Sequence, residues 1–505
     1  MAARVVHEAR RWLAASPFAT VVAIAAAAAA TGTLGREPSA HEPRPGKRPN
    51  VLVIMTDDQN ASDLWVMRHV RHDLAARGVT FERFYATFPL CCPSRVSFLT
   101  GQYAHNTGVV GNNEQGNCGP GTVLSPFNLG TALQRAGYRT GYFGKYLNGY
   151  SGFAGRFPAA IPHGWSRWLA ITHPISGVSR SWAADDQGRI RHYRGDPTRA
   201  IGAAAARYIA RSARAGRPFF AWVATHAPHS DNPPPPPGTP NPRPAPRDQG
   251  AFAGRPLPRP PSFNEPDVSD KPPFLRLPRL DAEQIAHLRD HYVGRLESLL
   301  AVDRMVHRLV ARLRSLGELD RTWIVFTSDN GYLLGEHRIV KKRALYEEAV
   351  RVPFVIRGPR GALPAGAVRR QIAGNVDLAP TLFAITGARP LRPFDGISLL
   401  PLARDPAAAA HRAILLENLS KSGVSSRAIR SPRWTLIEHR TGGGPRPDAF
   451  ELYDMRRDPY QLRNLYGRSL EAARHPRLAA ARRRLERRLA GLARCAGHRP
   501  PRPCR

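Results

Sequence analysis

Cysteine and lysine are scarce in this chain of 505 residues, and long apolar runs are nearly absent. None of the five cysteines has the C-x-x-C spacing typical of zinc sites, so the sequence gives no sign of a cysteine-based zinc site. The main apolar stretch, Phe18–Ala30, is too short and too rich in alanine to predict a membrane span, which needs about 20 apolar residues. We therefore expect no transmembrane segment.

Acidic residues are far fewer than basic ones, and the formal net charge is +35. One explanation is a polyanionic partner, because excess positive potential gathers acidic ligands. The other is a coding bias that favours Arg, Ala, Pro and Gly together. We favour the coding bias because this composition is uniform along the chain. We expect no nucleic-acid partner.

The N-terminus has the pattern of a targeting segment. A basic start precedes the apolar stretch, and small residues that suit a cleavage site follow before Gly35. The pattern predicts a signal peptide over residues 1–35 and a Pro-rich linker over 36–48. We expect export to the medium, the periplasm or the cell surface. Such a destination permits disulfides, and Cys495 and Cys504 are spaced to close a short loop.

Short apolar runs alternate with helical patterns along most of the chain. Runs of this kind suit strands buried on both faces, and the alternation predicts an α/β sandwich with a mostly parallel sheet. The expected strands are Asn50–Thr56, Tyr138–Phe143, Pro218–Thr225, Thr322–Ser328 and Pro353–Ile356. The expected helices lie near Leu64–Ala76, Asn128–Ala136, Ile201–Ala213 and Asp281–Leu316.

Two parts of the chain depart from this alternation. Residues 231–280 are rich in proline, which predicts a long loop or insertion. The pattern changes again after residue 405, so we expect a large domain over 49–405 and a smaller C-terminal domain over 406–505. The elements expected in the smaller domain are strands at Ala413–Glu417 and Trp434–Glu438 and a basic helix at Leu478–Leu492.

Two of the expected strands run directly into oxygen-bearing side chains. Asp57 and Asp58 follow one strand, and Asp329 and Asn330 follow another. Ligands of parallel sheets bind beyond the carboxyl ends of the strands, so we expect these side chains to converge. Oxygen ligands favour a hard divalent cation, Ca²⁺ or Mg²⁺, over zinc. The alternative is that the aspartates only cap helices, but the matching positions of the two pairs favour the metal.

A longer motif carries a resemblance to a known family. The segment CCPSRVSFLTG, from Cys91 to Gly101, fits the pattern C-x-P-S-R-x-x-x-L-T-G at every defining position. This pattern resembles the signature of type I sulfatases, which belong to the alkaline-phosphatase-like superfamily. The resemblance implies an alkaline-phosphatase-like sandwich with an antiparallel sheet in the smaller C-terminal domain. It also implies that Cys91 is oxidised to formylglycine by a separate formylglycine-generating enzyme.

The resemblance extends to other single residues in chain order. Arg95 matches the arginine that steadies the hydrated aldehyde, and Lys145 matches a lysine that contacts both aldehyde and sulfate. His229 matches the histidine that protonates the leaving oxygen, and Lys342 matches a second sulfate-binding lysine. The residues that match the family's metal ligands are Asp57, Asp58, Asp329, Asn330 and the modified Cys91.

Three positions leave alternatives open. His226 lies close to His229, and we favour His229 because it follows a proline. Lys341 is adjacent to Lys342, and only spacing decides between them. Many sulfatases have a histidine two positions after the first lysine, placed to deprotonate the aldehyde hydrate. Leu147 stands there in this chain, so the base of that step is open.

A formylglycine hydrate explains why the cysteine needs oxidation. One hydroxyl attacks sulfur and displaces the alcohol, and deprotonation of the other lets the hemiacetal expel sulfate. A sulfated thiol has no such exit. The metal lowers the hydroxyl pKa and neutralises the sulfate oxygens. We expect a sulfate ester hydrolase; the alternatives are an arylsulfatase, a phosphodiesterase or phosphonate hydrolase of the same superfamily, or a non-catalytic polyanion-binding protein.

Within the family, the motifs look most similar to N-acetylglucosamine-6-sulfatases and their extracellular relatives. This similarity rests on the adjacent cysteines, on the segment GKYLN from Gly144, and on the Asn-Asn-Glu run that ends at Glu114. Asn113 and Glu114 follow the signature closely enough to reach the site and bind sugar hydroxyls. We expect a sulfated sugar such as N-acetylglucosamine-6-sulfate as the substrate. Cys495 and Cys504 also resemble the end of that group, and we expect them to pair.

Overall fold

The computed structural model describes residues 48–150, 161–173, 181–231, 240–410, 413–442, 444–497 and 504. The expected signal peptide, residues 1–35, lies outside the described residues, as do most of the expected linker and residues 232–239 of the expected insertion. Within the described ranges, no helix has both the length and the apolar character that a membrane crossing requires.

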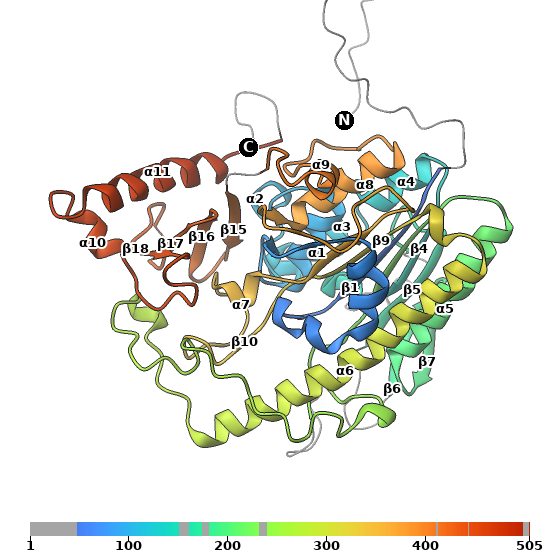
Figure 1. The fold of residues 1–505 in the computed structure, drawn as a ribbon, viewed down its shortest axis with the longest axis horizontal. Helices are drawn as coiled ribbons and strands as arrows, with labels where there is room; N and C mark the ends of the chain where they lie inside the picture. The colour runs from blue at the N-terminus through green and yellow to red at the C-terminus, as the bar shows by residue number, and fades with distance from the viewer. Residues whose placement is uncertain are drawn as a thin grey trace, which may run out of the picture. The chain divides into compact units, whose positions relative to one another are not determined.

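A ten-stranded sheet forms the centre of the fold (Figure 1). In spatial order its strands are β13 (Ala367–Arg369), β2 (Val79–Phe81), β12 (Phe354–Arg357), β9 (Thr322–Ser328), β1 (Asn50–Thr56), β8 (Phe219–Ala224), β4 (Arg139–Gly144), β5 (Arg167–His173), β6 (Ser181–Asp186) and β7 (Arg189–Arg194). The five strands from β9 to β5 are parallel. Antiparallel pairings occur at β12 and at β6. The expected α/β fold with a mostly parallel sheet is confirmed.

The apolar run of β1 is buried on both of its faces. Successive side chains of a strand point to opposite faces, so Val51 and Val53 pack into one core while Leu52 and Ile54 pack into another. A strand that is covered on both sides needs apolar residues at every position. This explains why the bounds predicted from the sequence for β1 and β9 agree with those in the structure.

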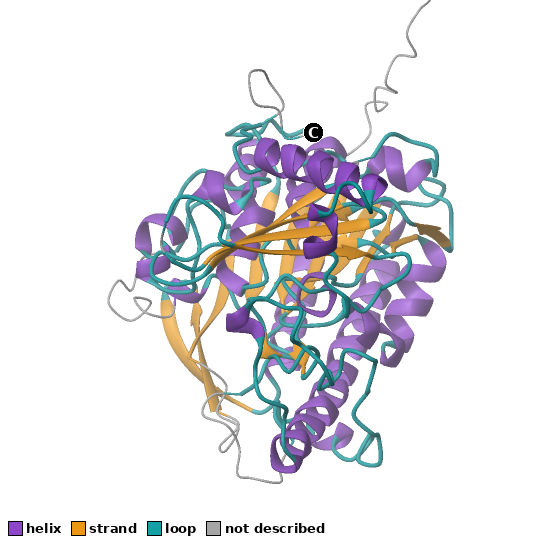
Figure 2. Ribbon diagram, turned by 90° about the vertical axis from the view of Figure 1, so that its left-hand side faces the viewer, coloured by secondary structure: helices purple, strands orange, loops and turns teal. Residues whose placement is uncertain are grey.

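Helices cover both faces of the sheet, as Figure 2 shows. The core of one face takes side chains from α1 (Cys91–Thr100), α4 (Leu129–Arg135) and α8 (Leu378–Thr386). The core of the other face takes them from α5 (Pro197–Arg214) and α6 (Ala282–Ser315). Both long helices have capped starts, where Asp196 accepts from the Thr198 N–H and Asp281 forms a capping box with Gln284.

The single helix expected near Leu64–Ala76 is wrong. The segment consists of a 3₁₀ helix at Ala61–Val66, one π turn at Val70–Leu74 and a 3₁₀ turn at Ala75–Arg77. Its first helix ends at Met67, which has φ −94° and ψ 75°. The buried carboxylate of Asp303 accepts hydrogen bonds from the backbone N–H groups of His69 and Val70, at 3.0 and 2.8 Å. A separate turn starts there.

The C-terminal part contains the expected antiparallel sheet. Its strands are β15 (Ile414–Asn418), β16 (Ser425–Arg430), β17 (Trp434–Arg440) and β18 (Ala449–Asp454). Helix α11 (Pro476–Leu492) contributes Leu485 and Leu489 to the core of this sheet. That core also contains Tyr346 from the larger part of the chain. Residues 47–505 form one compact unit, and the expected boundary near residue 405 stays a prediction.

Short elements and irregular segments complete the described chain. The described part of the Pro-rich insertion has little regular structure, in keeping with the expected loop. The short elements are β3 (Phe84–Tyr85), α2 (Ala104–Thr107), the 3₁₀ turn Glu114–Gly116, α3 (Pro120–Val123), the 3₁₀ turn Asn148–Tyr150, the 3₁₀ turn Pro246–Asp248, the 3₁₀ turn Pro273–Leu275, the 3₁₀ turn Leu319–Arg321, β10 (Leu333–Leu334), β11 (Val340–Lys341), α7 (Glu347–Val350), β14 (Ala373–Gly374), the 3₁₀ turn Asn375–Asp377, α9 (Leu400–Arg404) and α10 (Tyr466–Leu470).

Candidate active site

The ends of β1 and β9 lie side by side at one edge of the sheet. The strands are parallel with Thr56 opposite Ser328, so the residues after each strand leave the sheet together. Asp58 has φ 69°, a left-handed conformation that is uncommon outside glycine, and its N–H donates to Asp329 Oδ1 at 3.1 Å. The turn brings carboxylate oxygens of Asp57, Asp58 and Asp329 within 4.8 Å of one another.

Asn330 adds an amide to this cluster. Its Nδ2 donates to Asp58 Oδ1 at 2.6 Å and to the Gly331 carbonyl at 2.8 Å. Its Oδ1 is buried and accepts no hydrogen bond from the parts of the chain that the structure describes. A buried oxygen without a donor suits a bound cation. Three carboxylates and an amide oxygen are the hard donors that Ca²⁺ and Mg²⁺ prefer, so the residues present fit such an ion.

The buried carboxylates do not ionise equally. Burial opposes ionisation of Asp57, but the surrounding cations, Lys145 foremost, outweigh burial and hold its pKa well below the usual range. Burial is likewise outweighed at Asp58, whose pKa is lowered chiefly by Lys342. Burial and the charge of Asp57 together raise the pKa of Asp329. A divalent cation among the three carboxylates would offset this repulsion.

Cys91 is the first residue of α1 and lies beside the carboxylates. Its Sγ is 3.4 Å from Asp57 Oδ1, and the side chain is fully buried. Burial raises the pKa of the Cys91 thiol to about 12, and the charge of Asp57 adds to the shift. A thiol with this pKa is protonated near neutral pH and is a weak nucleophile. An unmodified Cys91 is therefore poorly suited to attack a substrate.

Arg95 lies one helical turn after Cys91 and is also fully buried. Its Nε donates to Asp329 Oδ2 at 2.8 Å, and its Nη2 lies 3.3 Å from Asp57 Oδ2. Its Nη1 donates to the backbone carbonyl of Lys145. One guanidinium thus joins α1, the carboxylate cluster and the end of β4, and it holds them in a fixed arrangement.

Two lysines direct their ammonium groups at Cys91. Lys145 follows β4, with Nζ 3.6 Å from Cys91 Sγ and in an ion pair with Asp57. Lys342 has Nζ 3.1 Å from the same sulfur and 2.5 Å from Asp58 Oδ1. Burial would lower the pKa of each lysine, but the aspartates outweigh it, so both pKa values are raised. An anion at residue 91 would meet two positive charges.

His229 completes the group around the carboxylates. Its Nε2 lies 3.8 Å from Asp58 Oδ2, and its Nδ1 donates to the Ser230 carbonyl at 2.8 Å. In the neutral ring, Nε2 is therefore the basic nitrogen that faces the site. Burial and Lys145 lower the pKa of His229. The ring of His226 lies 4.9 Å away from that of His229, and within the described ranges it forms no ion pair with the carboxylates.

The two other open positions differ in their surroundings. Lys341, the alternative to Lys342, is exposed on β11. Leu147, which stands where many sulfatases have a histidine, is 3% exposed and packs in an apolar core with Tyr142 and Trp222. A side chain in that core cannot take a proton, so a base has to come from elsewhere.

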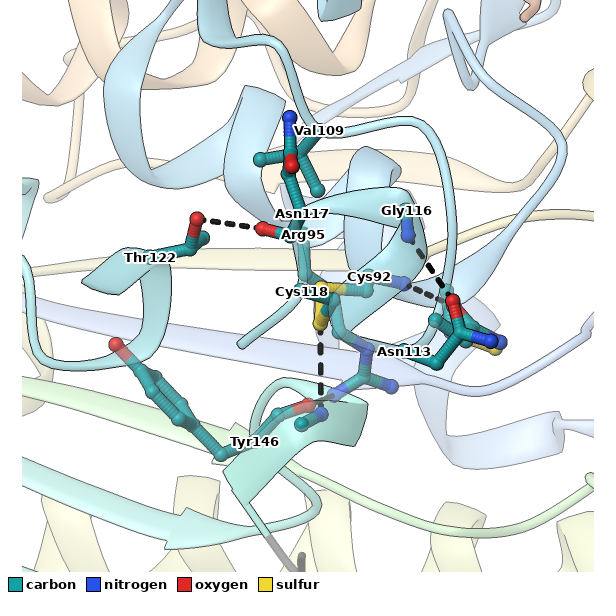
Figure 3. Close-up of a disulfide and its surroundings, with 12 residues drawn as sticks. Cys92, Arg95, Val109, Asn113, Gly116, Asn117, Cys118, Thr122 and Tyr146 are labelled. Atoms are coloured by element: carbon teal, nitrogen blue, oxygen red, sulfur yellow. Dashed lines mark hydrogen bonds between the residues drawn. A yellow bond between two sulfur atoms is a disulfide. The ribbon is translucent and has the colours of Figure 1, made fainter. Parts of the chain in front are cut away.

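The sequence reasoning missed a disulfide between Cys92 and Cys118 (Figure 3). It ties the start of α1 to the loop before α3. The Gly149 N–H donates to Cys118 Sγ at 3.4 Å, and a Cβ at Gly149 would meet the Cys118 carbonyl oxygen at 1.6 Å. The segment that begins with Lys145 therefore packs closely on this disulfide. Elimination could have found the pair once the other three cysteines had been assigned.

The run from Asn112 to Glu114 makes mostly local contacts. Asn112 Oδ1 accepts from the Cys92 N–H at 2.9 Å. Asn113 Oδ1 accepts from the Gly116 N–H at 3.0 Å, a bond that Figure 3 shows, and Glu114 is exposed. A role of Asn113 and Glu114 in substrate binding stays a prediction. The expected disulfide between Cys495 and Cys504 is confirmed.

Two buried residues that no sequence motif marked hold the site in place. Arg295 of α6 donates from Nη2 to the Asp58 carbonyl at 2.7 Å and to Asp63 Oδ2 at 3.0 Å. Asn375 donates to the Ser94 carbonyl at 3.0 Å and accepts from the Thr87 N–H at 3.0 Å. The first fixes the turn after β1, and the second fixes the start of α1.

Comparison with protein families gives two matches. The family model named Sulfatase matches residues 49–388. A model of the C-terminal region of N-sulphoglucosamine sulphohydrolase matches residues 335–489. Together the two models cover the ten-stranded sheet, the residues around Cys91 and the whole C-terminal sheet.

Curated proteins and solved structures give further similarities. An arylsulfatase of Volvox carteri is 31% identical over 89% of this chain and 75% of its own length. Human N-acetylglucosamine-6-sulfatase is 33% identical over 75% of this chain and 68% of its own length. The extracellular sulfatase SULF-1 homolog of Drosophila melanogaster is 35% identical over 70% of this chain but only 31% of its own length. A solved structure in complex with D-glucosamine-2-N,6-O-disulfate has a TM-score of 0.69 at 24% identity, and the match covers 86% of this chain and 97% of that one.

Proposed function

We propose that this chain, which belongs to the sulfatase family, hydrolyses the sulfate ester of a sulfated sugar such as N-acetylglucosamine-6-sulfate. The family makes the chain a sulfuric ester hydrolase. The observation that carries the proposal is the surroundings of Cys91. Cys91 stands at the start of α1. Its Sγ lies within 3.6 Å of the ammonium groups of Lys145 and Lys342 and of the carboxylate of Asp57. The human relative at 33% identity supports the sugar.

A modified residue and a cation would complete this site. When present, formylglycine at residue 91 supplies a hydroxyl nucleophile, and Ca²⁺ or Mg²⁺ held by Asp57, Asp58, Asp329 and Asn330 supplies charge neutralisation. The carboxylate oxygens of Asp57, Asp58 and Asp329, which lie within 4.8 Å of one another, support the cation, and the match to the sulfatase family supports formylglycine. A separate formylglycine-generating enzyme would be the maturation partner.

The remaining charged side chains orient the sulfate and move protons. Lys145 and Lys342 attract the sulfate oxygens from two sides. Arg95, on the same helix as residue 91, binds Asp329 and fixes the positions of the two residues relative to each other. The negative charge of a bound sulfate favours the protonated form of His229 against the burial and the Lys145 charge that lower its pKa, and this form gives a proton to the leaving sugar oxygen. The neutral His229 then has a free Nε2, and with Leu147 in the core it is our candidate for the base of the second step.

The disulfides support an exported protein. Two disulfides, Cys92–Cys118 and Cys495–Cys504, need an oxidising compartment in most organisms. The similarity to the extracellular sulfatase SULF-1 homolog points the same way. We therefore propose export to the medium, the periplasm or the cell surface, as the N-terminal sequence predicts.

The test compares two substrates at equal concentration. We expect a higher kcat/KM for N-acetylglucosamine-6-sulfate than for a simple aryl sulfate, which the Volvox relative makes the second candidate. Aryl turnover without any sulfate released from the sugar would contradict the proposed substrate. Mass spectrometry of the peptide spanning residues 84–95 tests the nucleophile separately. Retention of the sulfur of Cys91 in an active preparation would contradict the formylglycine assignment.

A further inference from the structure

A second basic cleft lies between α5, α6 and the 3₁₀ turn at Pro246–Asp248, outside the site around Cys91. Its volume is about 820 Å³, far more than a single sulfate ion occupies. Arginines from four separate segments of the chain line it. They are Arg194 at the end of β7, Arg199 in the first turn of α5, Arg247 in the 3₁₀ turn, and Arg304 and Arg308 on α6.

Most of this positive charge has no carboxylate partner. Arg304 forms an ion pair with Asp248, with Nη1 to Oδ1 at 2.7 Å. Asp196 also lines the cleft; its carboxylate accepts from the Thr198 N–H and caps α5, and its charge also acts on Arg308. Throughout the described ranges, the other four arginines form no ion pair with an acidic side chain.

The arginines are close enough to repel one another. Burial lowers the pKa of Arg308, and the charges of Arg304, Arg199 and Arg247 lower it further, while the charge of Asp196 opposes them. Five guanidinium groups against the carboxylates of Asp196 and Asp248 leave a surplus of positive charge in the cleft. Such a surplus favours anions, because each guanidinium can bind a sulfate or carboxylate through two parallel hydrogen bonds. The cleft therefore favours a ligand that carries several negative groups.

The wall of the cleft suits a sugar chain. Between the arginines its lining consists largely of small residues, which leave room for rings to lie flat. These residues are Gly195, Ala200, Ala203, Ala245 and Ala301. Among the described residues, no lysine and no aromatic side chain lines it, so it lacks the aromatic platforms on which single-stranded nucleic-acid bases stack.

One packing contact and one spacing along α6 relate the cleft to the candidate active site. Ile201, next to the cleft residue Ala200, packs toward Gly144, where a Cβ would lie 3.3 Å from Ile201 Cδ1. Gly144 directly precedes Lys145. On α6, Arg304 follows Arg295, which holds the Asp58 turn, by nine residues, or about 13 Å at roughly 1.5 Å per residue. This rise sets the scale of the separation, and it exceeds the length of a monosaccharide but not that of a sugar chain of several units.

We propose that this arginine cleft binds a sulfated oligosaccharide, as a second site that holds the chain whose sulfate is cleaved near Cys91. The inference rests on the proposed function, because it takes a sulfated sugar chain as the natural substrate. The cleft should raise affinity for long sulfated chains and leave turnover of a monosaccharide sulfate unchanged. Its contribution should fall as ionic strength rises, since exposed charges are screened.

The binding test uses Cys91→Ala protein, which binds without turnover, and a heparin octasaccharide measured by isothermal titration calorimetry. The cleft variant is Arg199→Gln/Arg247→Gln/Arg308→Gln in that background. The control variant is Arg483→Gln/Arg484→Gln/Arg487→Gln, which removes three exposed charges from α11. We expect about tenfold weaker octasaccharide binding in the cleft variant, as the loss of several charged hydrogen bonds predicts, and little change in the control.

Kinetics and a second polyanion complete the test. With the native Cys91, the cleft variant should keep its kcat/KM for N-acetylglucosamine-6-sulfate and lose kcat/KM for the octasaccharide. Equal losses of octasaccharide binding in the cleft and control variants would overturn the proposal, as would no loss in either. If the cleft variant also bound a single-stranded oligonucleotide of equal charge about tenfold more weakly, the assignment to sulfated sugars would be overturned. Cleft-dependent octasaccharide binding with no sulfate released from any sugar would support the cleft and refute the proposed substrate.

Discussion

Removal of the Cys92–Cys118 disulfide should destabilise the protein and reduce its activity without abolishing it. The two cysteines are 26 residues apart. In the chain-entropy model, a closed loop of that size stabilises the folded state by about 3.5 kcal/mol. We therefore expect the Cys92→Ala/Cys118→Ala variant to lose about 3.5 kcal/mol of unfolding free energy in urea.

The expected loss of activity follows from what the disulfide supports. Cys118 contacts the segment that contains Gly149 and begins with Lys145, whose Nζ lies 3.6 Å from Cys91 Sγ. A looser segment should misplace this ammonium group and lower kcat/KM by about tenfold, a modest cost for a small displacement. The assay is sulfate release from the preferred substrate, at a temperature where both proteins are folded.

The single variant Cys92→Ala is a second comparison. It removes the same disulfide and leaves the Cys118 thiol against the segment that contains Gly149. We therefore expect the single and double variants to lose similar stability and activity. An unchanged urea midpoint in the double variant would refute the role of the disulfide. Complete loss of activity in a folded double variant would mean that Cys92 takes part in the chemistry.

Further predictions concern the nucleophile, the cation, a buried histidine and the second disulfide. Cys91→Ala should abolish turnover and leave the free energy of unfolding in urea within about 1 kcal/mol of wild type, because it removes little volume; a large loss of stability would show a structural role. Dialysis against EDTA should abolish activity and Ca²⁺ should restore it in the wild type, whereas Asp329→Ala should need far more Ca²⁺; activity indifferent to EDTA would exclude the cation. Burial, aided by Arg295, lowers the pKa of His291 to about 3, so the folded state binds fewer protons than the unfolded state and stability should fall as the pH drops below about 6.5. Between pH 7 and pH 5, the free energy of unfolding measured in urea should therefore fall by about 2 kcal/mol less for His291→Gln than for wild type. Equal decreases in the two proteins would contradict this. The Cys495→Ala/Cys504→Ala variant should lose about 2.6 kcal/mol of unfolding free energy in urea. This is less than the loss expected for the Cys92–Cys118 disulfide, because these two cysteines are only 9 residues apart.

The strands and the signature motif could be located from the sequence because their signals are local. The apolar runs Asn50–Thr56 and Thr322–Ser328 are strands with the expected bounds, since both faces of each strand are buried. The acidic residues after each run were expected to converge because parallel strands end at one edge of a sheet. The structure brings Asp57 and Asp329 together as that rule requires.

Other elements could not be predicted because a distant residue shapes them. Asp303 accepts hydrogen bonds from backbone N–H groups more than 230 residues earlier in the chain, and these bonds interrupt the helix expected near Leu64–Ala76. The edge strand β7 was missed because its side chains are mostly exposed and basic, so it lacks the apolar signal of a central strand.

The sequence by itself determined the elements, the family signature and the types of residue available for chemistry. Only the tertiary structure decided which of them meet. It separated Lys342, 3.1 Å from Cys91 Sγ, from the exposed Lys341, and it paired Cys92 with Cys118. It also placed Arg295 against a turn 237 residues away and gathered the arginines of the second cleft. Contacts between residues so distant in the chain leave no periodicity and no spacing in the sequence, because folding alone creates them.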